Sequence, residues 1–238
     1  MTAKPRAVFI AALPREIASL VSQRGWRADQ KLLARNIHLF EHESAIVACA
    51  GMGSHRASLA VDAALSLGPA SELISIGWAG SCTDRYHVGD VIRANIVVDV
   101  KTGERFFSEG KGQGKRGQDV VVTVVAPASA KEKQRLGVAY YAAAVDMEAA
   151  AVARNASARE LPFYAIKAIS DDADFELPGT ERFITPDGQF REAAFAVYVA
   201  LRPNLWKSVL TLAKSSKLAA QHLCAAIEAH IQNGDRHS

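Results

Sequence analysis

Residues 165–174 read AIKAISDDAD, an apolar run that stops at an acidic cluster. Such a run predicts a buried strand that delivers its last carboxylate to the edge of a sheet. Earlier in the chain, residues 144–153 read AVDMEAAAVA and place Glu148 at the start of an alanine-rich helix. Open α/β sheets bind ligands at the carboxyl ends of their parallel strands. Two acids from neighbouring elements at such an edge suggest acid–base chemistry on a small molecule.

Strand and helix patterns alternate along the rest of the chain. Apolar runs predict strands at 7–12, 37–40, 45–50, 73–76, 91–100, 120–125 and 163–169, the second and third forming a hairpin. Helical patterns cover 15–23, 55–67, 130–136 and 147–158, and Ser54 is placed to cap the second of these. Glycine motifs at 51–54 and 77–80 are expected to be strand-end turns where backbone approaches a ligand. The alternation predicts a three-layer α/β fold, with a mixed, mostly parallel twisted sheet flanked by helices.

Two segments differ from this pattern. The basic, glycine-rich stretch 111–117 could contact a phosphate, but it is more typical of a surface loop. From Leu205 to His230, apolar residues recur at helical spacing with lysines among them. The simpler interpretation is an amphipathic helix packed on the core, and the sharper one is a helix that receives a greasy ligand or contacts a membrane surface. We therefore expect one α/β domain over residues 1–200 and a packed helical extension over 201–238.

Length and composition exclude several classes of protein. A chain of 238 residues can bury a core of its own, and its net charge of +3, from scattered basic residues, argues against nucleic-acid binding. Cys49, Cys82 and Cys224 lie far apart, match neither a disulfide framework nor a metal motif, and favour the cytoplasm. The histidines lack ligand spacing, so we expect neither a metal nor a cofactor. No stretch approaches transmembrane length.

Five short motifs occur in an order that belongs to a known family. They are AGMG at 50–53, IGWAG at 76–80, VGDV at 88–91, VDMEA at 145–149 and ISDDAD at 169–174. Over about residues 6 to 175 the chain resembles the nucleoside phosphorylase/nucleosidase superfamily, and particularly the methylthioadenosine/S-adenosylhomocysteine nucleosidases. It also resembles the hopanoid-associated phosphorylase-like proteins, which are thought to act on adenosylhopane. That second likeness rests on VDME, on SDDAD followed by Leu177-Pro178, and on the tail at 201–205.

The resemblance implies cleavage of a purine N-glycosidic bond. The leaving base needs a proton or strong hydrogen bond at N7, the cationic sugar needs a nearby anion, and a nucleophile must reach the opposite face, as in two-carboxylate glycoside hydrolysis. Asp171 matches the acid that faces the base, with Asp172 and Asp174 as competitors, and a closed pocket would favour its protonated form. Glu148 matches the acid that binds the ribose hydroxyls and stabilises the sugar cation. Glu16 matches, by spacing, the acid that activates water; the alternative is a surface glutamate at a helix N-terminus.

The same resemblance implies the substrate contacts. They are Met147, Gly53, Trp78, Ala79, Gly80, Ser170 and Ala126. Met147 would pack on the sugar, Ser170 would orient the catalytic aspartate, and Ala126 belongs to the approximate base-facing loop. Trp78 departs from the family, which usually has a small residue there. It could stack on the ligand, fill the space that phosphate would need, or pack in the core.

Water is the expected nucleophile, and phosphate is the alternative. The phosphate-using hexameric branch has an arginine near positions 75–76 that is missing here, although Arg15 or Arg56 could replace it. The segment between residues 90 and 146 is shorter than in the methylthioadenosine nucleosidases, which leaves the 5′ substituent open. We therefore expect a purine nucleosidase, with 5′-substituted adenine nucleosides favoured. A phosphorylase, adenine release from adenosylhopane in hopanoid biosynthesis, and a non-catalytic binding scaffold are the alternatives. The family is usually dimeric or larger, so a homodimer is expected.

Overall fold

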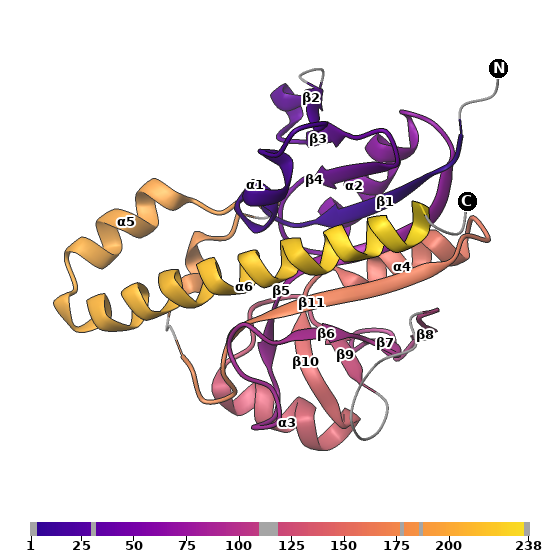
Figure 1. Ribbon diagram of the computed structural model, residues 1–238. Coiled ribbons are helices and arrows are strands. Elements are labelled where there is room, and N and C mark those ends of the chain that lie inside the picture. Colours follow the sequence, from indigo (N-terminus) through magenta and orange to yellow (C-terminus); the bar gives the residue numbers. More distant parts are fainter. Residues whose placement is uncertain (1–3, 30–31, 110–118, 177–178, 186–187, 236–238) are drawn as a thin grey trace.

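The computed structural model describes residues 4–29, 32–109, 119–176, 179–185 and 188–235. An 11-stranded mixed sheet runs through it, with helices on both faces (Figure 1). The strands are β1 (Arg6–Ala11), β2 (Arg27–Asp29), β3 (His38–Glu41), β4 (Ala45–Cys49), β5 (Ala70–Ser81), β6 (Val91–Arg93), β7 (Ile96–Asp99), β8 (Arg105–Phe107), β9 (Val120–Thr123), β10 (Ala142–Asp146) and β11 (Phe163–Asp171). The helices are α1 (Pro14–Val21), α2 (Ser54–Leu65), α3 (Ala130–Tyr140), α4 (Ala149–Ser157), α5 (Glu192–Ala200) and α6 (Pro203–Asp235), with 3-10 turns at Leu33–Arg35 and Thr180–Phe183. The predicted three-layer α/β fold is confirmed, while the segment 111–117 lies outside the described residues.

β5 is the central strand of the sheet. The order is β2-β3-β4-β1-β5-β10-β9-β7-β8, and β11 branches from β5 and carries β6. Parallel pairs join β1 to β4 and to β5, β5 to β11, and β9 to β7 and to β10. The predicted hairpin of β3 and β4 is antiparallel, as is the short contact between β5 and β10. Because β5 pairs with β1, β10 and β11, this one strand joins all the branches of the sheet.

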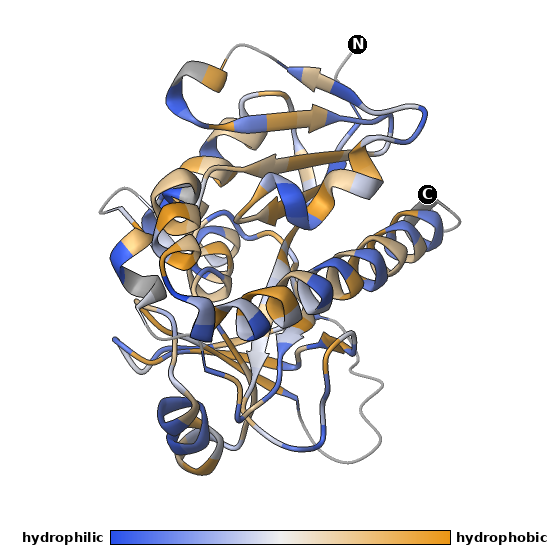
Figure 2. Ribbon diagram, turned by 90° about the vertical axis from the view of Figure 1, so that its left-hand side faces the viewer, coloured by the Kyte–Doolittle hydropathy of each residue, from blue (hydrophilic) through white to orange (hydrophobic). Residues whose placement is uncertain are grey.

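Two apolar layers cover the sheet. α2 and α4 pack on one face, and α1 and α6 pack on the other. Figure 2 shows apolar strands at the centre and alternating polar and apolar bands along α6. The apolar stripe of α6 buries Ala219, Leu223, Cys224 and Ile227 against the sheet and α1. Packing of this helix on the core therefore agrees with the sequence pattern, and a domain boundary at residue 200 remains a prediction.

Several predicted boundaries are wrong for identifiable reasons. The motif 77–80 is not a strand-end turn, because β11 pairs with β5 past it and keeps the strand extended to Ser81. Residues 91–100 form two short strands, β6 and β7, which pair with different partners. Ser54 does not cap α2, since Gly53 occupies the N-cap and Ser54 is the first helical residue. The helix expected at 147–158 starts at Ala149, behind the unpredicted strand β10.

None of the described helices is long and apolar enough to span a lipid bilayer.

Candidate active site

Three predicted acids lie at the ends of the strands that pair with β5. Glu16 stands in the first turn after β1, Glu148 follows β10, and Asp171 is the last residue of β11. Two glycines of β5 make room for these side chains. A Cβ atom on Gly77 would lie 3.1 Å from Glu16 Oε1, and one on Gly80 would lie 2.9 Å from Asp171 Oδ2. The structure therefore gathers the three carboxylates around one central strand, although they are far apart in sequence.

Glu16 is buried and held by backbone amides. Its Oε2 accepts hydrogen bonds from the N–H groups of Ala12 (3.0 Å) and Leu13 (2.9 Å), and its Oε1 accepts one from Trp78 N–H (3.1 Å). As the third residue of α1, it reaches back to the N-cap amide, as the acid of a capping box does. Burial raises the pKa of this carboxyl, and the amide hydrogen bonds oppose the shift. Glu16 is thus a helix N-terminal glutamate, but it points into the protein rather than to solvent.

Glu148 occupies the N-cap of α4 and is also buried. Its Oε1 accepts a hydrogen bond from Gly53 N–H (2.7 Å), and its Oε2 accepts one from Met147 N–H (3.3 Å). Burial raises the pKa of Glu148 to about 7, the negative charge of Asp146 adds to this shift, and Lys167 opposes it. A carboxyl that titrates near neutrality suits acid–base chemistry at physiological pH.

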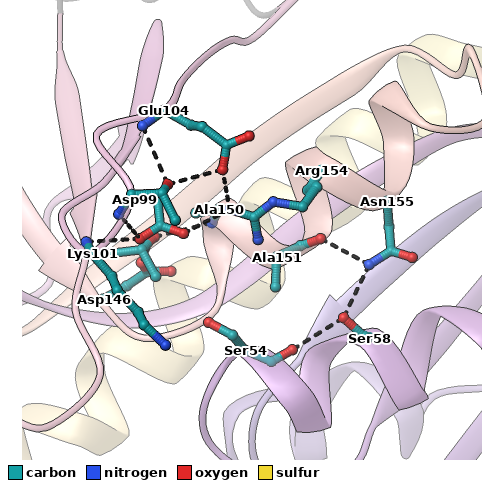
Figure 3. Close-up of polar contacts among 12 residues, drawn as sticks. Ser54, Ser58, Asp99, Lys101, Glu104, Asp146, Ala150, Ala151, Arg154 and Asn155 are labelled. Atoms are coloured by element: carbon teal, nitrogen blue, oxygen red, sulfur yellow. Dashed lines mark hydrogen bonds and ion pairs between the residues drawn. The ribbon is translucent and has the colours of Figure 1, made fainter.

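The polar contacts behind Glu148 fix the helix that carries it (Figure 3). Arg154 of α4 forms an ion pair with Asp99 at the end of β7 (2.7 Å). Asn155, one residue further, donates through Nδ2 to Ser58 Oγ of α2 (3.1 Å). Because α4 is tied on two sides, the direction of its N-terminus, and with it the position of Glu148, is set by the fold.

Asp171 has two side-chain partners. Ser170 Oγ donates to its Oδ1 (2.7 Å), and the ammonium group of Lys133, from α3, contacts its Oδ2. Lys133 is buried and donates also to the carbonyls of Asp172 (2.8 Å) and Phe175 (3.2 Å). The Asp171 side chain is 19% exposed and has a cation against its carboxylate, and a closed pocket around it remains a prediction.

A second ion pair lies deeper, between Lys167 of β11 and Asp146 of β10. Nζ and Oδ2 are 2.8 Å apart, and both side chains are fully buried. Lys167 also donates to Ser75 Oγ (2.9 Å) and to a carbonyl of β5, while Asp146 Oδ1 accepts a hydrogen bond from Thr123 Oγ1 (2.7 Å). Buried charges persist only when paired and hydrogen-bonded, and here both conditions are met.

Sequence reasoning missed the roles of Lys133, Lys167 and Asp146. Lys167 lies close enough to Glu16 and Glu148 to lower the pKa of both. The sequence did contain a signal for Lys167, because a lone lysine in an apolar strand requires an acid partner. Lys133 carried no such signal, since it sits in a polar helix among other charged residues.

The structure also places the other residues that were predicted to contact the substrate. Gly53 and Trp78 supply backbone N–H groups to the two glutamates, and the Ala79 carbonyl faces Ser170 Oγ (3.4 Å). The Trp78 ring packs in the layer beneath α1 and α6, and within the described residues its buried indole N–H has no hydrogen-bond partner. Ala126 is exposed in the loop after β9. Because β9 runs parallel to β10, this loop lies at the sheet edge where β10 ends.

The two candidate arginines are placed differently. Arg56 is buried and donates to the backbone carbonyls of Ala50, Arg35 and Asn36. Arg15 is exposed and lies over the Trp78 ring, 5.2 Å from its centroid.

A cavity of about 300 Å³ opens beside Asp171, between the loop after β11 and α6. The end of β11 and the loop after it contribute four acids, and α6 contributes three hydroxyls and a leucine. The lining residues are Val88, Ser170, Asp171, Asp172, Asp174, Phe175, Glu176, Ser208, Thr211, Leu212 and Ser215. The cavity thus lies between Asp171, the predicted acid on β11, and the start of α6, which is otherwise exposed.

Comparison with known proteins places the chain in a family. A family model described as "Phosphorylase superfamily" matches residues 6–131 and 100–201. The chain belongs to this superfamily. It is an enzyme of the nucleoside phosphorylase and nucleosidase kind, which confirms the resemblance of its motifs. No curated protein sequence matches it.

Solved structures share the fold at low sequence identity. The 5′-methylthioadenosine nucleosidase of Arabidopsis thaliana is 18% identical, with a TM-score of 0.70 and coverage of 96% of this chain and 95% of that one. A Helicobacter pylori nucleosidase with 5′-methylthioadenosine in its active site is 16% identical (TM-score 0.65, 95% and 99% covered). The futalosine hydrolase of the same organism is 17% identical (TM-score 0.65, 94% and 98% covered). These likenesses show that the superfamily fold extends over nearly the whole chain.

Proposed function

We propose that this enzyme hydrolyses the N-glycosidic bond of a purine nucleoside, favouring 5′-substituted adenine nucleosides, and releases the free base. The observation that carries the proposal is the set of three carboxylates around β5, two of which have raised pKa values. Solved structures of the same fold include nucleosidases for 5′-methylthioadenosine and a futalosine hydrolase, which supports hydrolysis.

Asp171 would bind the base. Ser170 and Lys133 each occupy one of its oxygens, which leaves acceptor positions open. The exocyclic amino group of adenine is a donor and suits such an acceptor, whereas the 6-oxo group of hypoxanthine does not. In its protonated form Asp171 would pass its proton to N7 as the bond to the sugar breaks, and the Lys133 ammonium would stabilise the carboxylate that remains.

Glu148 would bind the ribose. Gly53 and Met147 use one acceptor position on each oxygen, so each oxygen can still accept a ribose hydroxyl. In its ionised form this carboxylate stabilises the positive charge that develops on the sugar.

Glu16 would activate water. Three backbone amides fill three of the roughly four acceptor positions of a carboxylate, which leaves one on Oε1 for a single water. Its raised pKa makes it a stronger base than an exposed glutamate. Phosphate, by contrast, needs cations, and both Arg56 and Lys167 are engaged with other groups. Water is therefore favoured as the nucleophile.

Product analysis tests the proposal. Purified enzyme is given methylthioadenosine, S-adenosylhomocysteine, adenosine and inosine, with and without inorganic phosphate. Free adenine without phosphate is the expected result, and E16Q, E148Q and D171N should each lose at least about 100-fold in kcat. Base and sugar 1-phosphate formed only with phosphate would make the enzyme a phosphorylase and remove the role of Glu16. Full turnover by E148Q and D171N would contradict the mechanism.

Adenine release from adenosylhopane is a second candidate. The cavity beside Asp171 is closed on one side by α6, and the start of this helix exposes large apolar side chains. A nucleoside with a lipid on its sugar would contact both this cavity and these apolar side chains. This function is supported if adenosylhopane is cleaved and the soluble nucleosides are not. A homodimer and a cytoplasmic location remain predictions.

A further inference from the structure

The charged residues around the turn of the α5–α6 hairpin are all basic. Between residues 193 and 227 the sequence contains no aspartate or glutamate, but it contains Arg202, Lys207, Lys214 and Lys217. These four positive charges exceed the net charge of +3 of the whole chain. In Figure 1, α5 and the first half of α6 project from the body of the molecule as an antiparallel pair.

Large apolar side chains are exposed on the same hairpin. Val197 and Leu201 lie one turn apart on α5 or its end and are 62% and 74% exposed. Trp206 and Leu210 lie one turn apart on α6 and are 50% and 63% exposed. Trp206 Nε1 donates to the Val199 carbonyl (2.9 Å), which holds the indole at the turn between the helices. Soluble monomers rarely expose a contiguous group of such residues without a function.

The cations flank this apolar group. Lys207, Lys214 and Lys217 lie three residues before, four after and seven after Leu210, so they share its side of the helix. Arg202 stands at the turn, with its guanidinium 3.9 Å from the centroid of the Tyr198 ring. Apolar and aromatic residues flanked by lysines are the pattern of helices that lie in the interface of an anionic bilayer.

We propose that the tip of the α5–α6 hairpin, residues 197–217, docks on the surface of an anionic lipid bilayer. The apolar residues enter the interface, and the lysines contact lipid phosphates. A second copy of the chain that packs hairpin against hairpin is a poorer occupant, because such a two-fold contact would place the same cations against each other with no carboxylate from residues 193–227 between them. The opposite side of α6, with Ser208, Thr211 and Ser215, lines the cavity beside Asp171. Docking would therefore bring this cavity close to the lipid.

Vesicle sedimentation of the full chain without any nucleoside tests this inference, so the result does not depend on the proposed reaction. The probes are vesicles of phosphatidylcholine with phosphatidylglycerol, and vesicles of phosphatidylcholine alone. We expect binding to the anionic vesicles that is lost near 1 M salt, where charges are screened beyond about 3 Å. Each lysine near such a surface contributes about 5-fold, so K207Q/K214Q/K217Q should bind about 100-fold more weakly.

Matched variants separate the charge pattern from total charge. K101Q/R105Q/K131Q removes three exposed cations from β8, its preceding turn and α3, and should change binding by less than about 3-fold. L201S/L210S removes apolar surface without touching the buried core and should weaken binding at least about 10-fold. Equal binding by the two triple variants, or no preference for anionic vesicles, would overturn the proposal. So would a dimer in solution that L201S/L210S converts to monomer, because the surface would then belong to a contact between copies.

Discussion

Replacing Lys167 by methionine should destabilise the enzyme through the acid that it leaves behind. The Lys167–Asp146 ion pair joins β11 and β10, two strands that both pair with β5, and water reaches neither side chain. In K167M, Asp146 keeps its hydrogen bonds from Thr123 Oγ1 and from the Ala149 amide (2.8 Å), but it loses its cation. Methionine fills a similar volume, so the change tests charge rather than packing.

The expected magnitude follows from the burial of both charges. Removing one partner of a buried ion pair costs about 3–5 kcal/mol, because the other charge stays buried without compensation. Replacing both partners by neutral groups costs much less. The loss in K167M/D146N should therefore be at least about 2 kcal/mol smaller than the sum of the losses in K167M and D146N. The exposed lysine variant K217M should stay within about 0.5 kcal/mol of wild type.

Urea unfolding followed by circular dichroism measures these differences. A loss of about 4 kcal/mol lowers the midpoint by roughly 1 M or more for urea dependences of about 3 kcal/mol per M. If K167M does not fold at all, recovery of folded protein in K167M/D146N supports the same reasoning. Strictly additive losses in the double variant would refute it, because Lys167 and Asp146 would then not act as a pair.

Four further outcomes follow from the site. Because the pKa of Glu148 is raised from 4.5 to about 7, the folded state binds a proton on this carboxyl more tightly than the unfolded state does. The free energy of unfolding should therefore fall as pH rises between these two values. Urea unfolding of E148Q should lack this pH dependence. The kcat/KM of the wild type should rise with pH through about 7 if ionised Glu148 is the active form. K133M should lower kcat by about 10- to 100-fold and alter its pH profile, because Asp171 loses the cation that orients its carboxylate and stabilises its charge; an unchanged profile with reduced stability alone would make Lys133 purely structural. Gly80→Ala should lower kcat/KM by about 100-fold, because its Cβ would displace the Asp171 carboxylate, and wild-type activity in this variant would argue against that placement.

The fold could be predicted where local pattern and tertiary context agree. β4 is an apolar run that ends before a glycine motif, β11 is one that ends at an acidic cluster, and both were expected near their observed positions. β10 was missed because its sequence, AAAVD, has little intrinsic preference for strand, and its neighbours β9 and β5 decide its conformation. The glycines of 77–80 suggested a turn, yet pairing with β11 holds them in the strand. In both cases long-range pairing overrides a local signal.

Asp171 was accessible from sequence because it follows an apolar run, so the end of its strand could be inferred before its neighbours were known. Glu148 was found at the start of a predicted helix, and Glu16 through its spacing in the family resemblance. Their partners were not accessible in this way. Asp146 and Lys167 meet only because β10 and β11 both return to β5, and no local pattern encodes that meeting. Lys133 looks like the solvent-facing Lys131 two residues away until α3 is placed against the loop after β11.

The distribution of charge in the site explains which acids have raised pKa values. Lys167 is paired with Asp146, and Lys133 is paired with Asp171. Glu16 and Glu148 receive hydrogen bonds from backbone amides, and within the described residues neither has a cation in salt-bridge contact. Burial therefore outweighs the amide hydrogen bonds and the charge of Lys167 at these two acids, and theirs are the pKa values that rise. The negative charge of Glu16 also raises the pKa of Glu148, so the positive charge that develops on the sugar would favour the ionised form of Glu148.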